Sequence, residues 1–153
     1  MARSYNIPGN ATNTASATLP LMSVISSTSV QPIVVAIEMG SDATPADNAV
    51  KYQIQRCTTT GTVGSSVTPM PLNPTSPACS TTSGLAIFSV GPTLTANAFV
   101  HQWAQNMRQA YRWQAYDLTK GLMCPATASN GLALISAVAA VAFNAVWSIV
   151  FEE

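Results

Sequence analysis

The stretch LALISAVAAVAFNAVWSIVF, residues 132–151, decides the fold class of this chain. It carries no charged residue and is long enough for a membrane-spanning helix of about 20 residues. However, alanine dominates over leucine, and no lysine or arginine flanks the stretch to set a topology. Its large side chains also fall on odd positions, with small or polar ones between them: Val141, Phe143, Trp147, Ile149 and Phe151.

Alternation at period two is typical of a strand. The stretch therefore predicts two strands, near Leu132–Val138 and Ala140–Phe151. The alternative is a small membrane protein in which residues 132–151 form a C-terminal transmembrane helix.

Two earlier segments alternate in the same way. Apolar residues of Ile33–Met39 share one face, and in Val50–Cys57 apolar residues alternate with Lys51 and two glutamines. This pattern predicts strands with one wet face. Turn-forming residues between them suggest that the two strands form a hairpin with a long loop. A third apolar run of strand length covers Leu85–Val90.

The rest of the chain contains few helix signals. Prolines between residues 58 and 83 are too dense for a helix or a central strand. His101–Leu118 fits either element, and its aromatic and glutamine content favours a strand from about Gln109. Six or more short strands with turns between them predict an all-β sandwich or barrel. The polar residues before position 20 predict an extended or flexible arm, so we expect an arm over residues 1–20 and one domain over 21–153.

The charge content is unusually low. Charged residues make up 8% of the chain, against about 25% in ordinary soluble domains. The chain is nevertheless 48% hydrophobic, which argues against disorder. We therefore expect much of the surface to be covered in a homo-oligomer or larger assembly. The formal net charge is zero and no basic run exists, so nucleic acid is not an expected partner.

No recognisable catalytic or metal motif is present. The sequence lacks the nucleophile-elbow, zinc-protease and phosphate-loop patterns. His101 is the single histidine, and the spacing of Asp42, Asp47 and Asn48 does not match an EF-hand loop. We therefore expect no enzyme activity, no catalytic residues, no metal and no cofactor.

The cysteines give no indication of a metal site. Cys57, Cys79 and Cys124 lack the close pairing of metal ligands, and we expect buried reduced thiols in a protein made in a cytoplasm. No signal peptide is expected at the N-terminus. A bridge between Cys57 and Cys79 stays open as an alternative.

One segment stands out as a candidate interface. Arginines and aromatic residues, both enriched at protein interfaces, cluster within eleven positions: Trp103, Arg108, Tyr111, Arg112 and Trp113. We expect these residues at an interface with another protein subunit. Their aromatic members could instead stack on a sugar, as in a glycan-binding protein.

Several segments resemble a known group of proteins. YQIQRCTTTG (residues 52–61) and SVTPMPLNPTSPA (residues 66–78) resemble virion structural proteins of tailed bacteriophages and cyanophages. Trp113, PATASNGL (residues 125–132) and the closing FEE (residues 151–153) are similar to the same group. The resemblance covers roughly residues 33–153 and carries over no functional residue.

The resemblance implies a specific structure and role. The fold would be all-β, a jelly-roll-like β-sandwich with an extended N-terminal arm. The role would be that of a capsid decoration or cement protein, often trimeric, which binds the major capsid protein on the virion surface. Such a protein would be made in the host cytoplasm and would have no membrane partner.

Overall fold

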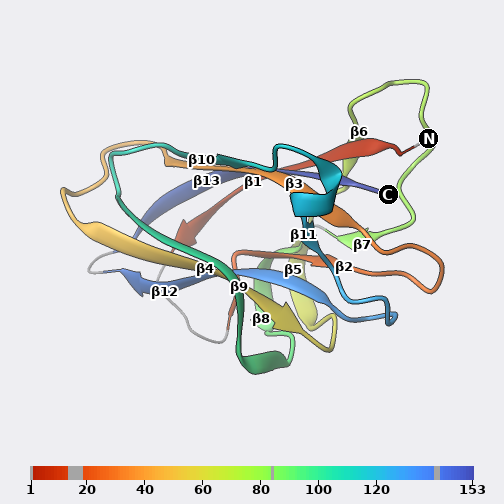
Figure 1. Ribbon diagram of the computed structural model, residues 1–153. Helices are drawn as coiled ribbons and strands as arrows, with labels where there is room; N and C mark the ends of the chain where they lie inside the picture. Colours follow the sequence, from red (N-terminus) through yellow and green to blue (C-terminus); the bar gives the residue numbers. More distant parts are fainter. Residues whose placement is uncertain (1, 14–18, 84, 140–141) are drawn as a thin grey trace.

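The chain folds into two antiparallel sheets packed face to face, shown in the computed structural model of Figure 1. The structure describes residues 2–13, 19–83, 85–139 and 142–153. Sheet A has the strand order β10-β3-β13-β1-β6, with β11 also pairing with β3. Its strands are β1 (Ser4–Asn13), β3 (Ile33–Ser41), β6 (Met70–Pro71), β10 (Tyr111–Gln114), β11 (Leu122–Met123) and β13 (Phe143–Glu152). The prediction of an all-β sandwich is confirmed.

Sheet B has the strand order β7-β2-β12-β4-β9. Its strands are β2 (Met22–Ile25), β4 (Ala49–Cys57), β7 (Thr82–Ser83), β9 (Leu94–Asn106) and β12 (Gly131–Ala139). A separate two-stranded ribbon pairs β5 (Thr62–Ser66) with β8 (Leu85–Val90), and a 3-10 helix covers Leu118–Lys120. Strand β5 was missed, because its short polar sequence follows a turn and lies in the proline-rich region.

The two predicted C-terminal strands are present as β12 and β13. The odd-numbered residues of β13 are buried in the core: Phe143, Ala145, Trp147, Ile149 and Phe151. Residues 140 and 141 lie outside the described residues. The helical interpretation of residues 132–151 is wrong, because large side chains at every second position give one fully apolar face only in an extended chain. Within the described residues, no helix is long and apolar enough to cross a membrane.

Strands β3 and β4 are also confirmed, but the predicted hairpin between them is wrong. Strand β3 pairs with β13 and β10 in sheet A, whereas β4 pairs with β12 and β9 in sheet B. The loop after Ser41 crosses from one sheet to the other, so that both strands direct their apolar faces into the same core. Alternation places side chains on faces but does not choose a partner strand.

The predicted N-terminal arm is wrong for residues 4–13. These residues form β1, which pairs with β13 along its whole length and with β6 at Tyr5 and Asn6. Tyr5 and Ile7 are completely buried and supply the apolar face that binds β1 to the core. Pro8 fits because β6 does not extend to it, so its missing N–H faces an open side. Residues 14–18 lie outside the described residues.

The eight main strands follow a simple rule. The first pairs with the last (β1 with β13), the second with the seventh (β2 with β12), the third with the sixth (β3 with β10) and the fourth with the fifth (β4 with β9). These eight strands therefore pair in nested order, whereas β5, β6, β7, β8 and β11 stand outside this rule. The first and third of these pairs lie in sheet A, and the other two in sheet B.

The proline-rich loop after β6 is held to the end of the chain. The hydroxyl of Tyr5 donates to the carbonyl oxygen of Pro77 at 3.1 Å. The carboxylate of Glu153 accepts hydrogen bonds from the backbone N–H groups of Ser80 and Thr81 and from the Thr81 hydroxyl, at 2.8 to 3.2 Å. These contacts fix an otherwise irregular segment against sheet A.

The centre of sheet A depends on a close approach between Gly9 and Trp147. The two residues face each other in the pairing of β1 with β13. A Cβ added at Gly9 would lie 2.5 Å from two carbons of the Trp147 indole. The ring of Trp147, itself 2% exposed, therefore lies directly against the backbone of Gly9.

Replacing Gly9 by alanine should destabilise the fold. In Gly9→Ala the new methyl group must displace a buried indole, and overpacking of this kind costs about 1–3 kcal/mol of unfolding free energy. Gly40→Ala is the matched control, because a Cβ there meets no atom within 4 Å. Urea denaturation of both variants measures the difference. Equal stability of Gly9→Ala and the wild type would contradict this packing.

Candidate functional site

The aromatic residues singled out in the sequence meet where the two sheets come together at one flank. Strand β9 is the last strand of sheet B and β10 is the last strand of sheet A. A tight turn joins them, in which the backbone N–H of Gln109 donates to the carbonyl oxygen of Asn106 at 2.9 Å. Met107, buried at this turn, anchors it to the core. The chain thereby crosses from one sheet to the other within a few residues.

Four rings fill this flank, and we name them the aromatic seam: His101, Trp103, Tyr111 and Trp113. His101 and Trp103 lie two residues apart on one face of β9, and Tyr111 and Trp113 are spaced in the same way on β10. Trp103 and Tyr111 stack with ring centroids 4.4 Å apart and an interplanar angle of 11°. The His101 ring lies 5.3 Å from that of Trp103 and 5.4 Å from that of Trp113. The seam therefore joins sheet A to sheet B.

Trp103 is stacked against two other rings. Its ring centroid lies 4.4 Å from that of Tyr111 and 5.3 Å from that of Tyr52 on β4. Trp103 is only 9% exposed, and its indole N–H donates to the side chain of Gln105 at 2.9 Å. It therefore has too little exposed surface for a sugar to stack on. Trp113 is half-buried and is the tryptophan of the seam that is more open to a partner.

His101 and Tyr111 form the polar contact of the seam. The Nε2 atom of His101 lies 2.5 Å from the Tyr111 hydroxyl oxygen. Burial lowers the pKa of His101 and raises the pKa of Tyr111. Both shifts favour the neutral forms, and the imidazole tautomer decides which of the two side chains donates the hydrogen bond. The seam is thus an uncharged contact.

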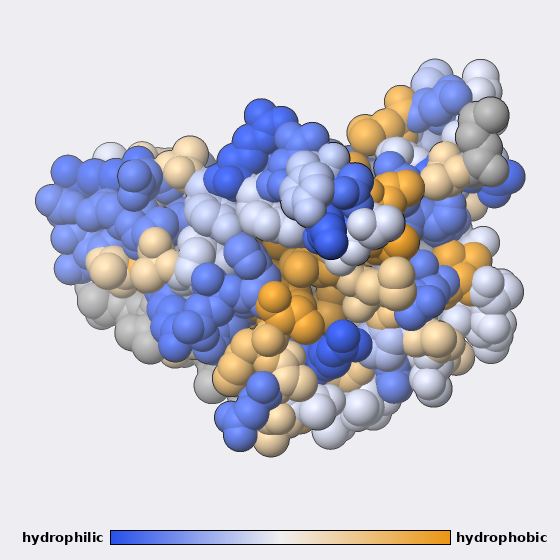
Figure 2. Space-filling view, viewed as in Figure 1, coloured by the Kyte–Doolittle hydropathy of each residue, from blue (hydrophilic) through white to orange (hydrophobic). Residues whose placement is uncertain are grey.

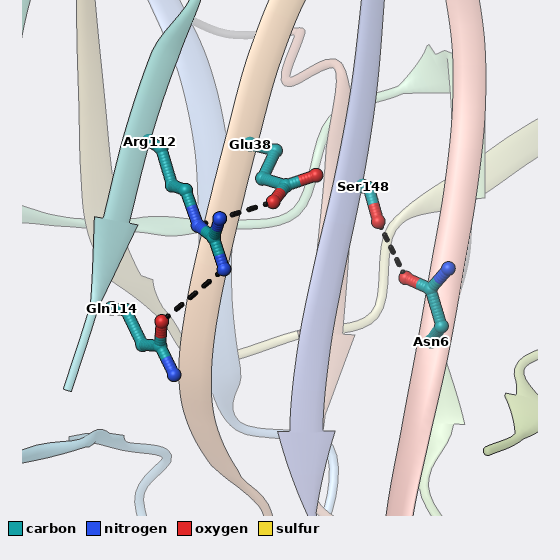
Figure 3. A network of polar contacts seen from close by, with 5 residues as sticks. All are labelled: Asn6, Glu38, Arg112, Gln114 and Ser148. Atoms are coloured by element: carbon teal, nitrogen blue, oxygen red, sulfur yellow. Dashed lines mark hydrogen bonds and ion pairs between the residues drawn. The ribbon is translucent and has the colours of Figure 1, made fainter. Parts of the chain in front are cut away.

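Arg108 and Arg112, the two arginines of the predicted interface set, point away from the aromatic seam. Arg108 lies in the turn, where its Nε donates to the carbonyl oxygen of Pro45 at 3.0 Å. Arg112 extends from the opposite face of β10, onto the outer side of sheet A. There its Nε lies 3.3 Å from a carboxylate oxygen of Glu38, the residue opposite it on β3 (Figure 3). Both of these side chains are more than half exposed, so the ion pair adds little stability.

A shallow groove of about 410 Å³ runs along this outer side of sheet A. Its polar floor contains Glu38, Arg112, Gln114 and Ser148, and Ser148 also donates to Asn6 at 2.8 Å (Figure 3). Leu72 and Leu118 form apolar walls. The groove offers hydrogen-bond donors and acceptors beside apolar surface but has no nucleophile paired with a base. The sequence did not predict it, because its residues come from strands that are distant along the chain.

The cysteines and the acidic residues form no reactive or metal-binding site among the described residues. None of the three cysteines forms a disulfide, so the bridge between Cys57 and Cys79 is absent. Burial raises the pKa of Cys57 to about 11 and that of Cys124 to about 12, which keeps both thiols protonated and unreactive. Cys79 is half-buried and its thiol contacts the carbonyl oxygen of Thr81 at 3.4 Å. Among the described residues, no group of three or more acidic, histidine or cysteine side chains could hold a metal ion.

The structure thus divides the predicted set. Trp103, Tyr111 and Trp113 come together in the seam, whereas Arg108 and Arg112 lie outside it. His101, which was not among the predicted interface residues, also belongs to the seam. The spacing of two residues between His101 and Trp103 was the signal for this, because it places both on one face of a strand.

Comparisons with known proteins add no assignment. The chain matches no protein-family model, no curated protein and no solved structure.

The seam predicts a pH dependence of stability. The folded state lowers the pKa of His101 below its ordinary value of 6.5, so the unfolded chain binds the proton more readily. The free energy of unfolding should therefore be level above about pH 7 and fall as the pH drops below about 6.5. Urea denaturation across this range measures the slope.

His101→Phe tests the source of that slope, because His101 is the chain's single histidine. The variant keeps a ring in the seam but has no proton to bind. We expect its stability to stay level across the range around pH 6 in which the wild type loses stability. A slope near pH 6 that persists in His101→Phe would show that the effect arises elsewhere.

Proposed function

We propose that this chain is a non-enzymatic virion structural protein, a jelly-roll decoration or cement protein on the head shell of a tailed phage. Its partners are further copies of itself and the major capsid protein. It is made in the host cytoplasm and acts on the outer surface of the virion. It stabilises the shell by adding interface area across neighbouring capsid subunits.

The observation that carries this proposal is the strand order. Pairing of the first strand with the last, the second with the seventh, and so on, distributed over two sheets, supports a jelly roll. Eight-stranded double-sheet jelly rolls are frequent in viral capsid and lectin domains. Of these two roles, capsid protein and lectin, the sequence resemblance to phage virion proteins favours the capsid role.

The composition of the surface supports assembly. Large hydrophobic side chains are exposed although the chain has few charges to keep a monomer soluble: Met70, Leu72, Val90, Phe99, Tyr116 and Met123. Figure 2 shows hydrophobic residues gathered in the middle of one face, in the region where Figure 1 places β9 and β11. A surface of this kind is expected where other subunits cover it.

The predicted interface residues suggest where the capsid binds. Arg108 and Arg112 are exposed and Trp113 is half-buried, so these three can reach a partner. Trp103 and Tyr111 lie behind them and hold the flank in place. We propose that the turn between β9 and β10 and the adjoining edge strand β10 form the capsid contact.

Co-sedimentation with capsids that lack the protein tests the proposal. The purified protein should bind saturably, with a fixed number of copies per shell, and should raise the temperature at which the shell opens. Turnover of a substrate, or absence of binding together with an unchanged shell stability, would contradict a cement role.

Arg108→Glu tests the contact surface. Reversing an exposed arginine should weaken capsid binding about tenfold or more, since removing an interface arginine commonly costs 1–2 kcal/mol or more. The free energy of unfolding should change by less than about 0.5 kcal/mol, because Arg108 is exposed. Lys120→Glu, an exposed cation of the 3-10 helix, is the matched control and should bind normally. Equal binding by both variants would move the contact away from this turn.

A second candidate, a tail or host-attachment protein that binds glycans, is favoured by the groove on sheet A. Gln114, Ser148 and the carboxylate of Glu38 could hydrogen-bond sugar hydroxyl groups there. Glycan-array binding that is lost in Gln114→Ala and kept in Trp103→Phe would support this candidate over the cement role.

A further inference from the structure

Strand β9 leaves a long edge of sheet B open. It is thirteen residues long and pairs with β4 on one side, and it has no second neighbouring strand among the described residues. The other edge strands of the two sheets are short: β6 and β7 have two residues each and β10 has four. Short edge strands are one way in which proteins avoid unwanted pairing, so β9 differs from the other edges.

The register identifies which backbone groups face outward. The N–H of Met107 donates to the carbonyl oxygen of Asn48, and the same register continues from Asn106 opposite Ala49 to His101 opposite Ile54. Hydrogen-bonded and non-hydrogen-bonded pairs alternate in an antiparallel ladder. His101, Trp103 and Gln105 therefore bond to β4.

The intervening residues direct their backbone groups away from β4. These are Gln102, Ala104 and Asn106, although the carbonyl oxygen of Asn106 accepts the turn N–H of Gln109. The outward groups of Gln102 and Ala104 form the repeating donor and acceptor pattern that another antiparallel strand requires.

Irregular structure protects only the N-terminal half of β9 from pairing with another strand. The register shifts between Ile54 and Gln55 and again before Cys57, and Asn97 has a positive φ of 58°. Bulges of this kind turn an edge away from pairing. The segment from His101 to Asn106 pairs regularly with β4 and contains no bulge, proline or charge.

The charge pattern of β9 fits a second copy of this chain as the partner. Around a two-fold axis, an edge strand meets itself, so any charge near the axis would oppose a like charge. Residues 94–106 carry no charge at all, which permits this arrangement. A different protein that recognised the edge by charge would find no charged residue on β9 to pair with.

We infer that the edge of β9 over residues 101–106 pairs antiparallel with the same edge of a second copy, so that the two B sheets become one continuous sheet. The inference rests on the proposed function as a self-assembling protein and specifies its self-contact. A two-fold contact of this kind gives a dimer, whereas the sequence resemblance implies a trimer.

Ala104→Pro tests the contact. Proline removes the outward N–H of residue 104 and leaves the hydrogen bonds to β4 intact, since edge strands tolerate proline where the N–H faces away. Ala104→Ser is the matched control, because it keeps the N–H at the same exposed position. Size-exclusion chromatography with light scattering should give twice the 16.0-kDa chain mass for the wild type and for Ala104→Ser. For Ala104→Pro it should give the mass of one chain.

Amide hydrogen exchange provides a second measurement on the unmodified protein. The amides of Gln102 and Ala104 should exchange slowly at high protein concentration and rapidly after dilution. The amides of Trp103 and Gln105, which bond to β4, should be protected at both concentrations.

The outcomes separate this inference from the proposed function. A folded Ala104→Pro that remains a dimer, or rapid exchange at Gln102 and Ala104 in the assembled protein, would overturn pairing through β9. A wild-type trimer would also overturn it, yet it would agree with the cement role. The proposed function itself fails only in the capsid-binding experiment.

Discussion

The rest of the structure depends on the pairing of β1 with β13. Ten consecutive residue pairs join them, from Ser4 opposite Glu152 to Asn13 opposite Phe143. Strand β13 also pairs with β3, so it lies at the centre of sheet A and presents its apolar face to sheet B. Gly9 allows the Trp147 indole to lie against the neighbouring strand. Without β13, sheet A would separate into two unconnected parts, and the core would lose the five buried side chains of this strand.

Neutral amides take the place that charges occupy in many other proteins. Gln53, Gln55 and Gln105 are each less than 10% exposed, and their side-chain N–H groups donate to Gln102, to the carbonyl oxygen of Thr95 and to that of Gln109. Buried amides with partners cost far less than buried charges. In a chain with 8% charged residues, sheet B therefore buries polar side chains as hydrogen-bonded amides and not as ions.

The sequence predicted what is local and missed what is not. Alternation in residues 33–39, 50–57 and 132–151 correctly predicted strands, because side-chain direction depends only on neighbouring residues. It could not choose partners, so β3 and β4 were wrongly joined. Strand β1 was missed because only two of its side chains, Tyr5 and Ile7, are fully buried and apolar. The aromatic seam shows both outcomes. The spacing of His101 and Trp103 along β9 could be seen in the sequence, whereas the contact of β9 with β10 could not be predicted without knowing which strands pair.

The nesting of early strands with late ones has a consequence for biosynthesis. A ribosome adds about 5–20 residues per second, and both sheets need strands from the last quarter of the chain, β12 and β13, as interior members. A nascent chain that ends before Gly131 contains most of the strands but has neither sheet's centre. It would expose its apolar faces until synthesis is nearly complete, and topologies dominated by distant pairings fold slowly. Chaperones that bind nascent chains are therefore expected to contact this protein while its apolar faces are still exposed.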